Sequence, residues 1–300
     1  MFEQIFGNEP IKTYLSKALA ENRLAQTLLF AGQDGIGKSL FAKELAAQIL
    51  GSARSPDLHL LAPEGKSGLY PIDALREMID CEHAAPFEAP GKVFILEEAD
   101  RMQPASANVL LKTLEEPTPD TTFILLSSHP SEMLPTILSR CTVLTFQPLP
   151  EPAIAALLQK KGHASHFAKL AHGSAGNAFE LAEHPEWDEH RQILFSLLAN
   201  RPSYPELSLQ LTKLEELVEE GKEEDPVRVN RRVEHLFAWV FMWHRDQHVR
   251  QFGGTDLFFP EEPRREPSPL NEVEQRIEQA RLGYQRNIKL STSLSAFFGG

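Results

Sequence analysis

Hydrophobic residues in the first half of the chain form short continuous runs that alternate with segments of helical periodicity. Apolar side chains recur at helical spacing in residues 39–50 and again in residues 105–115. The continuous apolar runs predict four buried strands, at residues 27–31, 92–97, 121–126 and 141–146. Strands that alternate with helices in this way predict an α/β domain built around a parallel sheet.

Beyond residues 148–150, Pro-Leu-Pro, the pattern becomes wholly helical. A second break at His184 and Pro185 predicts a linker, and the proline-rich run of residues 253–269 predicts an irregular loop between helices. The predicted helices are residues 152–161, 166–172, 175–183, 188–199, 206–220, 230–251 and 270–290. We therefore expect three domains, which are an α/β domain at 1–148, a small helical domain at 149–185 and a helical C-terminal domain at 186–300.

The composition is that of a globular protein with an acidic balance. The chain has 42 Asp and Glu against 30 Lys and Arg, a net charge of −12, whereas tight, independent DNA binding normally needs a basic surplus. Two cysteines, Cys81 and Cys141, are too few for a disulfide framework or a four-cysteine zinc site. No stretch approaches the roughly 20 apolar residues of a membrane helix. The first residues lack a secretory pattern, so we expect a cytoplasmic protein that does not contact membranes.

A glycine-rich turn follows the first predicted strand and precedes a predicted helix. Its sequence, Gly-Gln-Asp-Gly-Ile-Gly-Lys-Ser, fits the phosphate-binding pattern G-x-x-x-x-G-K-[ST] in full. The backbone around Gly32, Gly35 and Gly37 would close on a triphosphate at the positive end of the following helix. Lys38 would neutralise phosphate charge and Ser39 would bind Mg²⁺. The turn therefore predicts binding of ATP and Mg²⁺, although it could also be the remnant of a lost nucleotide site.

Two carboxylates stand at positions 97 and 98, where the second predicted strand ends. Glu97 and Glu98 would lie at the carboxyl end of this strand, near the phosphate-binding turn. The arrangement resembles a Walker B motif, in which Glu97 would complete the Mg²⁺ shell and Glu98 would act as the base that activates water. The alternative is a solvated acidic turn after a buried strand. Glu97 stands where most ATPases of this kind have aspartate, which argues against strong hydrolysis.

An arginine precedes the last predicted strand, in the sequence Leu138-Ser139-Arg140-Cys141. This sequence resembles the Ser-Arg-Cys motif of clamp-loader subunits, whose arginine reaches into the ATP site of a neighbouring subunit. The resemblance implies that Arg140 is an arginine finger that acts in trans. A guanidinium group suits that role because it stabilises charge on a transferring phosphoryl group better than an ammonium group does. The alternative is a strand-edge arginine in a surface ion pair.

Three longer segments resemble the same family, the clamp-loader subunits of bacterial DNA polymerase III. Residues 5–9 resemble its adenine-side segment, and residues 134–141 match the stretch that ends in the finger. Residues 107–117 are very close to its pattern A-N-x-L-L-K-T-L-E-E-P. The resemblance covers most of residues 1–150. It implies an AAA+ protein with a P-loop α/β domain, a small helical lid domain and an all-helical collar domain through which subunits assemble.

Within this family the chain is similar to the delta-prime type. Residues 56–59, Pro-Asp-Leu-His, and residues 63–65, Pro-Glu-Gly, match stretches of that type, and residues 173–178 resemble its form of the sensor 2 motif. The gamma and tau subunits have an arginine where this chain has Gly176, and that arginine contacts the γ-phosphate. Its absence implies that the chain's own ATPase activity is weak or absent. Ser128 aligns with the sensor 1 position.

The resemblance implies a place in a larger machine that opens a sliding clamp and sets it on primed DNA. Gamma or tau subunits hydrolyse ATP there, while a delta-prime subunit closes part of the ring and lends its arginine to an adjacent site. The expected partners are gamma or tau and delta, with the sliding clamp and primed DNA reached through the complex. Only Cys81 falls where zinc-binding relatives carry a cysteine-rich module, so no zinc is expected.

Two other functions remain open at this point. Intact Lys38 and Glu98 are compatible with an active ATPase, either a motor subunit like gamma or tau or another AAA+ remodelling enzyme, but Gly176 argues against the motor subunit. The phosphate-binding turn alone would also fit a small-molecule nucleotide kinase, which the helical C-terminal third argues against. A polymerase is not expected, because nothing in the sequence indicates paired aspartates that hold two catalytic metals.

Overall fold

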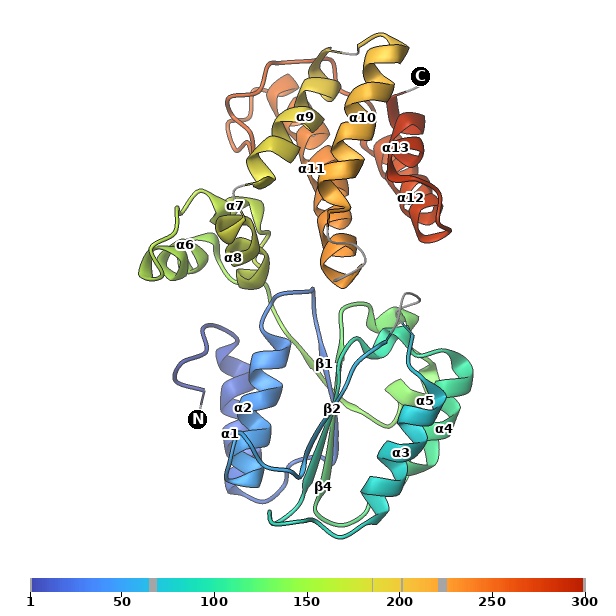
Figure 1. Cartoon of the computed structure of the whole chain (residues 1–300). Helices are drawn as coiled ribbons and strands as arrows, with labels where there is room; N and C mark the ends of the chain where they lie inside the picture. The colour runs from blue at the N-terminus through green and yellow to red at the C-terminus, as the bar shows by residue number, and fades with distance from the viewer. Residues whose placement is uncertain (1, 65–68, 185, 201, 221–225, 299–300) are drawn as a thin grey trace. The chain divides into compact units, whose positions relative to one another are not determined.

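The computed structural model of the protein describes residues 2–64, 69–184, 186–200, 202–220 and 226–298. Gly65 of the Pro-Glu-Gly stretch and Pro185 of the predicted linker lie outside the described residues. The chain divides into two compact units, Met1–Glu183 and His184–Gly300 (Figure 1). The first unit holds both the predicted α/β domain and the predicted small helical domain, and their separation at residue 148 stays a prediction.

A five-stranded parallel sheet forms the centre of the first unit, in the order β2-β3-β4-β1-β5. The strands are β1 (Thr27–Ala31), β2 (Leu58–Leu61), β3 (Lys92–Leu96), β4 (Thr121–Ser127) and β5 (Thr142–Thr145). The four strands predicted from apolar runs are confirmed. The hydrophobic pattern does not predict β2, whose four residues, Leu-His-Leu-Leu, form only a short run without β-branched residues, whereas β5 lies in the longer β-rich run of residues 141–146.

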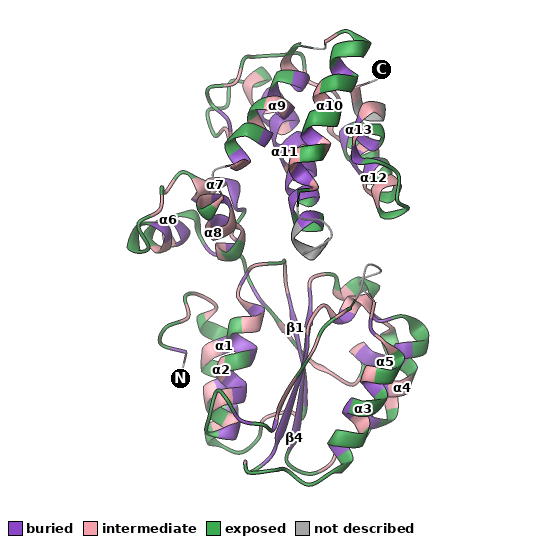
Figure 2. Ribbon diagram, in the orientation of Figure 1, coloured by how far each residue is buried: buried purple, intermediate pink, exposed green. Residues whose placement is uncertain are grey.

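Helices cover both faces of this sheet (Figure 1). One face carries α1 (Glu9–Ala20) and α2 (Lys38–Leu50), and the other carries α3 (Ile72–His83), α4 (Pro104–Glu115) and α5 (Pro135–Leu138). Strand β1 serves both cores, since Leu28 and Phe30 point to the first face while Leu29 and Ala31 point to the second. Every residue of β1, β3 and β4 is buried, as Figure 2 shows. Burial on both faces explains why these strands are continuous apolar runs.

Two short 3₁₀ turns, η1 (Ala99–Arg101) and η2 (Pro130–Glu132), follow strands β3 and β4. The first unit ends with α6 (Glu151–Lys160), α7 (Phe167–Leu170) and α8 (Ala175–Glu183), which confirm the three helical segments predicted there. These helices pack around a small core of their own that includes Leu149, Ile154, Leu158 and Ala178.

The described residues of the second unit form helices and connecting loops, without a strand. Its helices are α9 (Glu186–Asn200), α10 (Tyr204–Val218), α11 (Pro226–Gln251), α12 (Leu270–Gln285) and α13 (Leu290–Phe298). The prediction of one helix over residues 270–290 is wrong, because α12 ends at Gln285 and Asn287 adopts the left-handed conformation with φ 63°. A residue in that conformation breaks the helix, and α13 begins three residues later. Residues 253–269 contain neither helix nor strand, as predicted.

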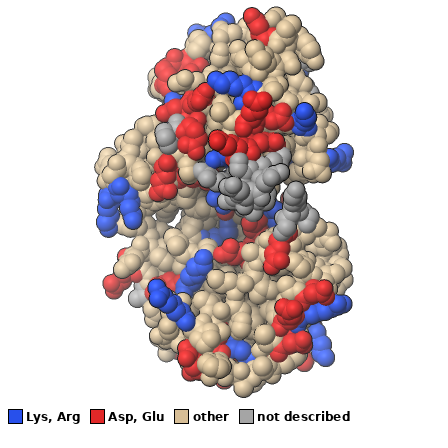
Figure 3. All heavy atoms as spheres, viewed as in Figure 1, with Lys and Arg blue, Asp and Glu red and all other residues tan. Residues whose placement is uncertain are grey.

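Charged residues are spread over both units, as Figure 3 shows for one face. Acidic side chains gather on the face of the C-terminal unit that is in view, with basic side chains scattered around them. This distribution agrees with the net charge of −12. Within the part of the chain that the structure covers, no helix has both the length and the apolar character to cross a bilayer.

Candidate functional site

The predicted phosphate-binding loop lies between the carboxyl end of β1 and the start of α2. Gly37 precedes the helix with φ 104°, a conformation that glycine adopts at little cost. The Lys38 ammonium donates hydrogen bonds to the carbonyl oxygens of Gly32 and Gln33 and to Ser128 Oγ, the last at 3.0 Å. Lys38 thus uses all three of its donors within the chain. The fold thus brings Lys38 into contact with two other predicted site residues, Gly32 and Ser128.

Lys38 is 7% exposed, so its ammonium group lies in a poorly solvated place. Burial lowers the pKa of Lys38 from its ordinary value, while the nearby carboxylates of Asp34, Asp100 and Glu98 act in the opposite direction. The phosphate loop therefore has three carboxylates around its one lysine. A polyphosphate that enters the loop therefore has to compete for Lys38 with the chain's own oxygen atoms.

The two predicted magnesium ligands contact each other. Ser39 Oγ donates to Glu97 Oε1 at 3.1 Å, and Lys43 Nζ lies 3.7 Å from the same oxygen. The hydroxyl of Tyr70 donates to the backbone oxygen of Glu97 and fixes the end of β3. A hydroxyl and a carboxylate oxygen at this separation are ligands that Mg²⁺ accepts. Ser39 and Glu97 therefore fit the predicted magnesium site.

Glu98, the predicted base, lies beside this pair but faces a different partner. Its backbone is left-handed, with φ 50°, and its carboxylate forms an ion pair with Arg101 Nε at 2.6 Å. A base has to reach the proton that it removes within hydrogen-bond distance. Arg101 therefore holds Oε2, one of the two oxygens through which Glu98 could accept a proton.

Asp100 is a site residue to which the sequence analysis gave no role. Its Oδ1 accepts the backbone N–H of Ser128 at 3.1 Å, which joins the end of β3 to the end of β4. Burial alone would raise the pKa of Asp100, but hydrogen bonds from His129, Ser127 and Ser128 hold it well below its usual range. Its place three residues after Glu97, on the same turn, is the signal that could have identified it.

One further group of side chains has the chemistry of metal ligands. Asp100, His129 and Glu132 bring one potential ligand atom each within 4.8 Å of one another. Asp100 is engaged with the backbone of Ser128, and its Oδ2 lies 3.7 Å from His129 Nδ1. Hydrogen bonding and ion pairing therefore account for this group without a metal.

The start of α8 packs directly on the phosphate loop. The backbone N–H of Gly176 donates to the carbonyl oxygen of Gly35 at 2.8 Å, and Gln33 Nε2 donates to the carbonyl oxygen of His172 at 2.7 Å. A Cβ atom at Gly176 would lie 2.8 Å from Gly35 Cα and 3.0 Å from its carbonyl oxygen. Any side chain at Gly176, an arginine included, would push α8 away from the loop.

Residues 5–9, which resemble an adenine-side element, contact the stretch of chain that leads into α6. Asn8 Oδ1 accepts the backbone N–H of Gln147 at 2.7 Å, and Asn8 Nδ2 donates to the carbonyl oxygen of the same residue. A Cβ atom at Gly7 would collide with the side chain of Leu149. The segment is therefore tied to the stretch that leads from β5 to α6.

Arg140 lies near the amino ends of the strands, whereas the phosphate loop lies at their carboxyl ends. It precedes β5, whereas the phosphate loop follows β1, and these strands pair in parallel with Leu28 opposite Thr142 and Ala31 opposite Thr145. The four residues of β5 alone span roughly 13 Å. An arginine side chain does not bridge that length, so Arg140 cannot serve the chain's own phosphate loop.

Sequence comparison identifies relatives of the first unit. Residues 7–150 match the protein family described as DNA polymerase III, delta subunit. A DNA polymerase III subunit delta' from Bacillus subtilis (strain 168) is 35% identical over 205 residues, which cover 61% of this chain and 61% of that protein. The subunit delta' of Escherichia coli (strain K12) is 33% identical over 163 residues, or 52% of this chain and 48% of that protein. The chain thus spans about half to three fifths of these curated relatives.

Structure comparison extends the likeness beyond the first unit. A RuvB variant from Thermotoga maritima superposes with a TM-score of 0.51 at 15% sequence identity and covers 98% of this chain and 86% of that one. At this identity the likeness concerns the fold alone. The fold is that of an AAA+ protein, in which a parallel α/β domain precedes a helical C-terminal part, and this confirms the fold class predicted from the sequence.

Proposed function

We propose that this chain is a delta-prime clamp-loader subunit in DNA replication, because residues 7–150 match a DNA polymerase III subunit family and the chain is 33–35% identical to delta' subunits over the matched parts. In this proposal it assembles with gamma or tau and delta subunits, in the cytoplasm, into a complex that sets a sliding clamp on primed DNA. The chain reaches the clamp and the DNA through the complex. It contributes Arg140 to the ATP site of an adjacent motor subunit.

One observation carries the trans role of Arg140, namely the separation of this residue from the chain's own phosphate loop. The two lie at opposite ends of neighbouring parallel strands, with the length of β5 between them. In a ring of similar subunits, an exposed edge of one subunit can face the nucleotide edge of the next. A guanidinium group at that contact can stabilise charge on the transferring phosphoryl group of the neighbour.

The chain's own nucleotide site has a lesser role in this proposal. Lys38 is bonded to three oxygen atoms of the chain, and Gly176 leaves no room for the arginine of the motor subunits. We propose that Mg-ATP binds here with weak to moderate affinity, through Gly32, Gly35, Gly37, Lys38 and Ser39, with Glu97 beside the metal. Bound nucleotide would then hold α8 and the loop together and would turn over little.

Replacing Lys38 with alanine is expected to weaken nucleotide binding by about tenfold or more, because hydrogen bonds to charged groups are worth roughly 1.5–3 kcal/mol. Titration of the chain with a fluorescent ATP analogue in the presence of Mg²⁺ measures the change. Lys112→Ala is the matched control, since this lysine is exposed on α4. If Lys38→Ala and wild type bind alike at millimolar nucleotide, the loop is vestigial.

Phosphate release by the isolated chain tests the assignment against the active ATPase and the kinase. We expect negligible turnover, because the motor-type arginine is absent at Gly176 and Glu98 is paired with Arg101. Addition of gamma or tau, delta, clamp and primed DNA should produce strong hydrolysis that depends on this chain. Turnover of about 1 s⁻¹ or more by the chain alone, within the range of working enzymes, would contradict the proposal and favour a motor subunit.

A further inference from the structure

The Arg140 side chain is held by a carboxylate from another element. Its Nε and Nη2 atoms both donate to Glu115 Oε2, at 3.2 and 2.6 Å, and its Nη1 donates to the carbonyl oxygen of Thr136 at 2.9 Å. Glu115 and Arg140 are 25 positions apart in sequence. The guanidinium group is therefore fixed on two sides, by the end of α4 and by α5.

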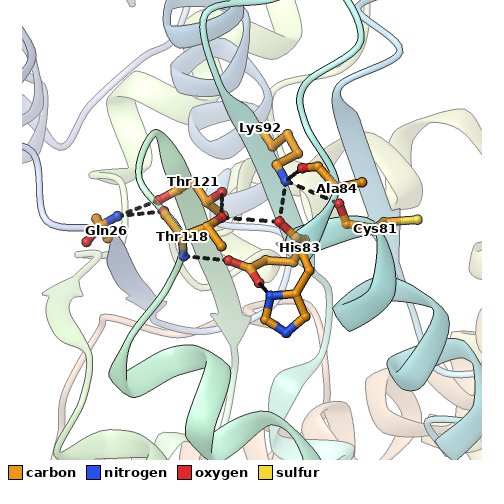
Figure 4. A network of polar contacts seen from close by, with 8 residues as sticks. Gln26, Cys81, His83, Ala84, Lys92, Thr118 and Thr121 are labelled. Atoms are coloured by element: carbon orange, nitrogen blue, oxygen red, sulfur yellow. Dashed lines mark hydrogen bonds and ion pairs between the residues drawn. The ribbon is translucent and has the colours of Figure 1, made fainter.

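Glu115 is the last residue of α4, and hydrogen bonds hold the chain both before and after it. The hydroxyl of Thr27 donates to the carbonyl oxygen of Leu114 at 3.4 Å in the buried interior. The side chain of Gln26 donates to the carbonyl oxygens of Thr118 and Thr121 (Figure 4). The start of β1 thus holds both the end of α4 and the turn that follows it.

A second set of contacts ties the same turn to α3, as Figure 4 shows. The backbone N–H of Thr118 donates to the fully buried carboxylate of Glu82 at 2.6 Å, and the Thr118 hydroxyl donates to the carbonyl oxygen of Glu82 at 3.1 Å. The ammonium group of Lys92 donates to the carbonyl oxygens of Cys81, Glu82 and Ala84 and closes the end of α3. The platform that presents Glu115 is therefore rigid on both sides.

We propose that Glu115 is the positioning residue for Arg140, an inference that rests on the trans role proposed above. A guanidinium group has five N–H donors. Three of them are engaged with Glu115 and Thr136, so two remain for the phosphate group of a neighbouring subunit. Glu115 fixes the direction in which these two donors point before the neighbour arrives. Preorganised donors need no rearrangement during the reaction and stabilise its transition state best.

The ion pair matters for position more than for stability. The Glu115 side chain is 57% exposed and that of Arg140 is 28% exposed, and an ion pair of this kind contributes only about 0–1 kcal/mol to folding. Glu116, the next residue, is also exposed, yet its carboxylate has no hydrogen bond or ion pair to any residue that the structure describes. Glu116→Ala therefore removes the same charge one position away and is the matched control.

The experiment uses the complex reconstituted with this chain, the motor subunits, delta, clamp and primed DNA. Single-turnover phosphate release is measured, and the part of it that Arg140→Ala slows is assigned to the site that Arg140 serves. Glu115→Ala should slow that part about three- to tenfold, since loss of orientation costs rate, while Arg140→Ala slows it more. Glu115→Gln, whose amide oxygen can still accept a guanidinium N–H, should recover part of the rate. ATP affinity and the Glu116→Ala control should match wild type.

The double variant Glu115→Ala with Arg140→Ala decides whether the two residues act together. If Glu115 acts through Arg140, the double variant is no slower than Arg140→Ala alone. Three results would each contradict the positioning role of Glu115 but leave the role of Arg140 intact. The losses of the two single variants could add up in the double variant, Glu115→Ala could react at the same rate as Glu116→Ala, or Glu115→Ala could react faster than wild type. A wild-type rate for Arg140→Ala would instead contradict the trans role of Arg140, and with it the positioning role of Glu115.

Discussion

Acidification from pH 7 to pH 4 should destabilise the C-terminal unit by about 3 kcal/mol through one histidine, at about 1.4 kcal/mol for each pKa unit. His190 on α9 is 1% exposed, and its ring packs edge-on against Trp187 with a centroid distance of 5.3 Å. Neither ring nitrogen has a hydrogen-bond partner among the described residues. Burial, reinforced by the positive charge of Arg232, lowers the pKa of His190 to about 4, while Glu186 and Glu189 oppose the shift.

The direction of the effect follows from where the proton binds. Histidine in an unfolded chain has a pKa near 6.5, so between pH 6.5 and pH 4 the unfolded state binds a proton that the folded state excludes. The free energy of unfolding therefore falls as the pH decreases through this window. Above pH 6.5 both states have a neutral histidine and the stabilisation is complete.

Urea denaturation at pH 7 and pH 4, followed by tryptophan fluorescence, measures this difference. The three tryptophans, Trp187, Trp239 and Trp243, all belong to the C-terminal unit, so their fluorescence reports on that unit alone. His190→Phe keeps a ring in place but cannot titrate, and it should lose most of the pH dependence. His184→Gln, at a half-buried position, should keep it. If His190→Phe is destabilised by acid as much as wild type, another group is responsible.

The sequence predicts the three central strands and the edge strand β5 but misses the other edge strand, β2, for a physical reason. β1, β3 and β4 are covered on both faces and must be apolar at every position, so they stand out as continuous runs. The two edge strands, β2 and β5, are only partly buried, so neither has to be apolar throughout. β5 is still recognisable from the β-branched and aromatic residues of its run at 141–146, which β2 lacks. The break between α12 and α13 depends on the left-handed backbone at Asn287, which leaves the apolar pattern around it unchanged.

The residues of the nucleotide site are predictable when one local motif holds them together. Lys38 and Ser39 belong to such a motif, and in the structure Lys38 contacts Ser128 and Ser39 contacts Glu97. The contact between Gly35 and Gly176 spans 141 positions and depends on how α8 packs, so the sequence alone does not show that these two glycines meet. Glu115 likewise belongs to a recognisable motif, but it pairs with Arg140 only because the folded chain brings the end of α4 next to α5.

Arg140→Ala should have the largest effect on activity of any single change in this chain. Arginine fingers supplied in trans are worth roughly 10³–10⁵ in rate in the best-studied GTPases. Only the motor site next to this chain would lose its finger, so total hydrolysis by the complex should fall by a fraction. Clamp loading needs coordinated sites and should fall further. Folding should be preserved, because the exposed pair with Glu115 contributes about 1 kcal/mol or less.

The matched control is Arg140→Lys, which keeps the positive charge but loses the planar fork of donors. If charge alone were needed, the lysine variant would work as wild type does. We expect it to stay impaired, because an ammonium group cannot pair with Glu115 through two donors in a fixed plane and still present two more to a phosphate group.

The most direct test of the account compares complexes that contain wild-type chain or Arg140→Ala, with all other subunits held constant. DNA-stimulated phosphate release and clamp loading are measured on both, after equal assembly and equal ATP affinity have been established. The account predicts reduced phosphate release and a larger loss of clamp loading in the variant complex. Wild-type values for both activities would mean that Arg140 serves only to pair with Glu115, and would contradict its action on a neighbouring ATP site.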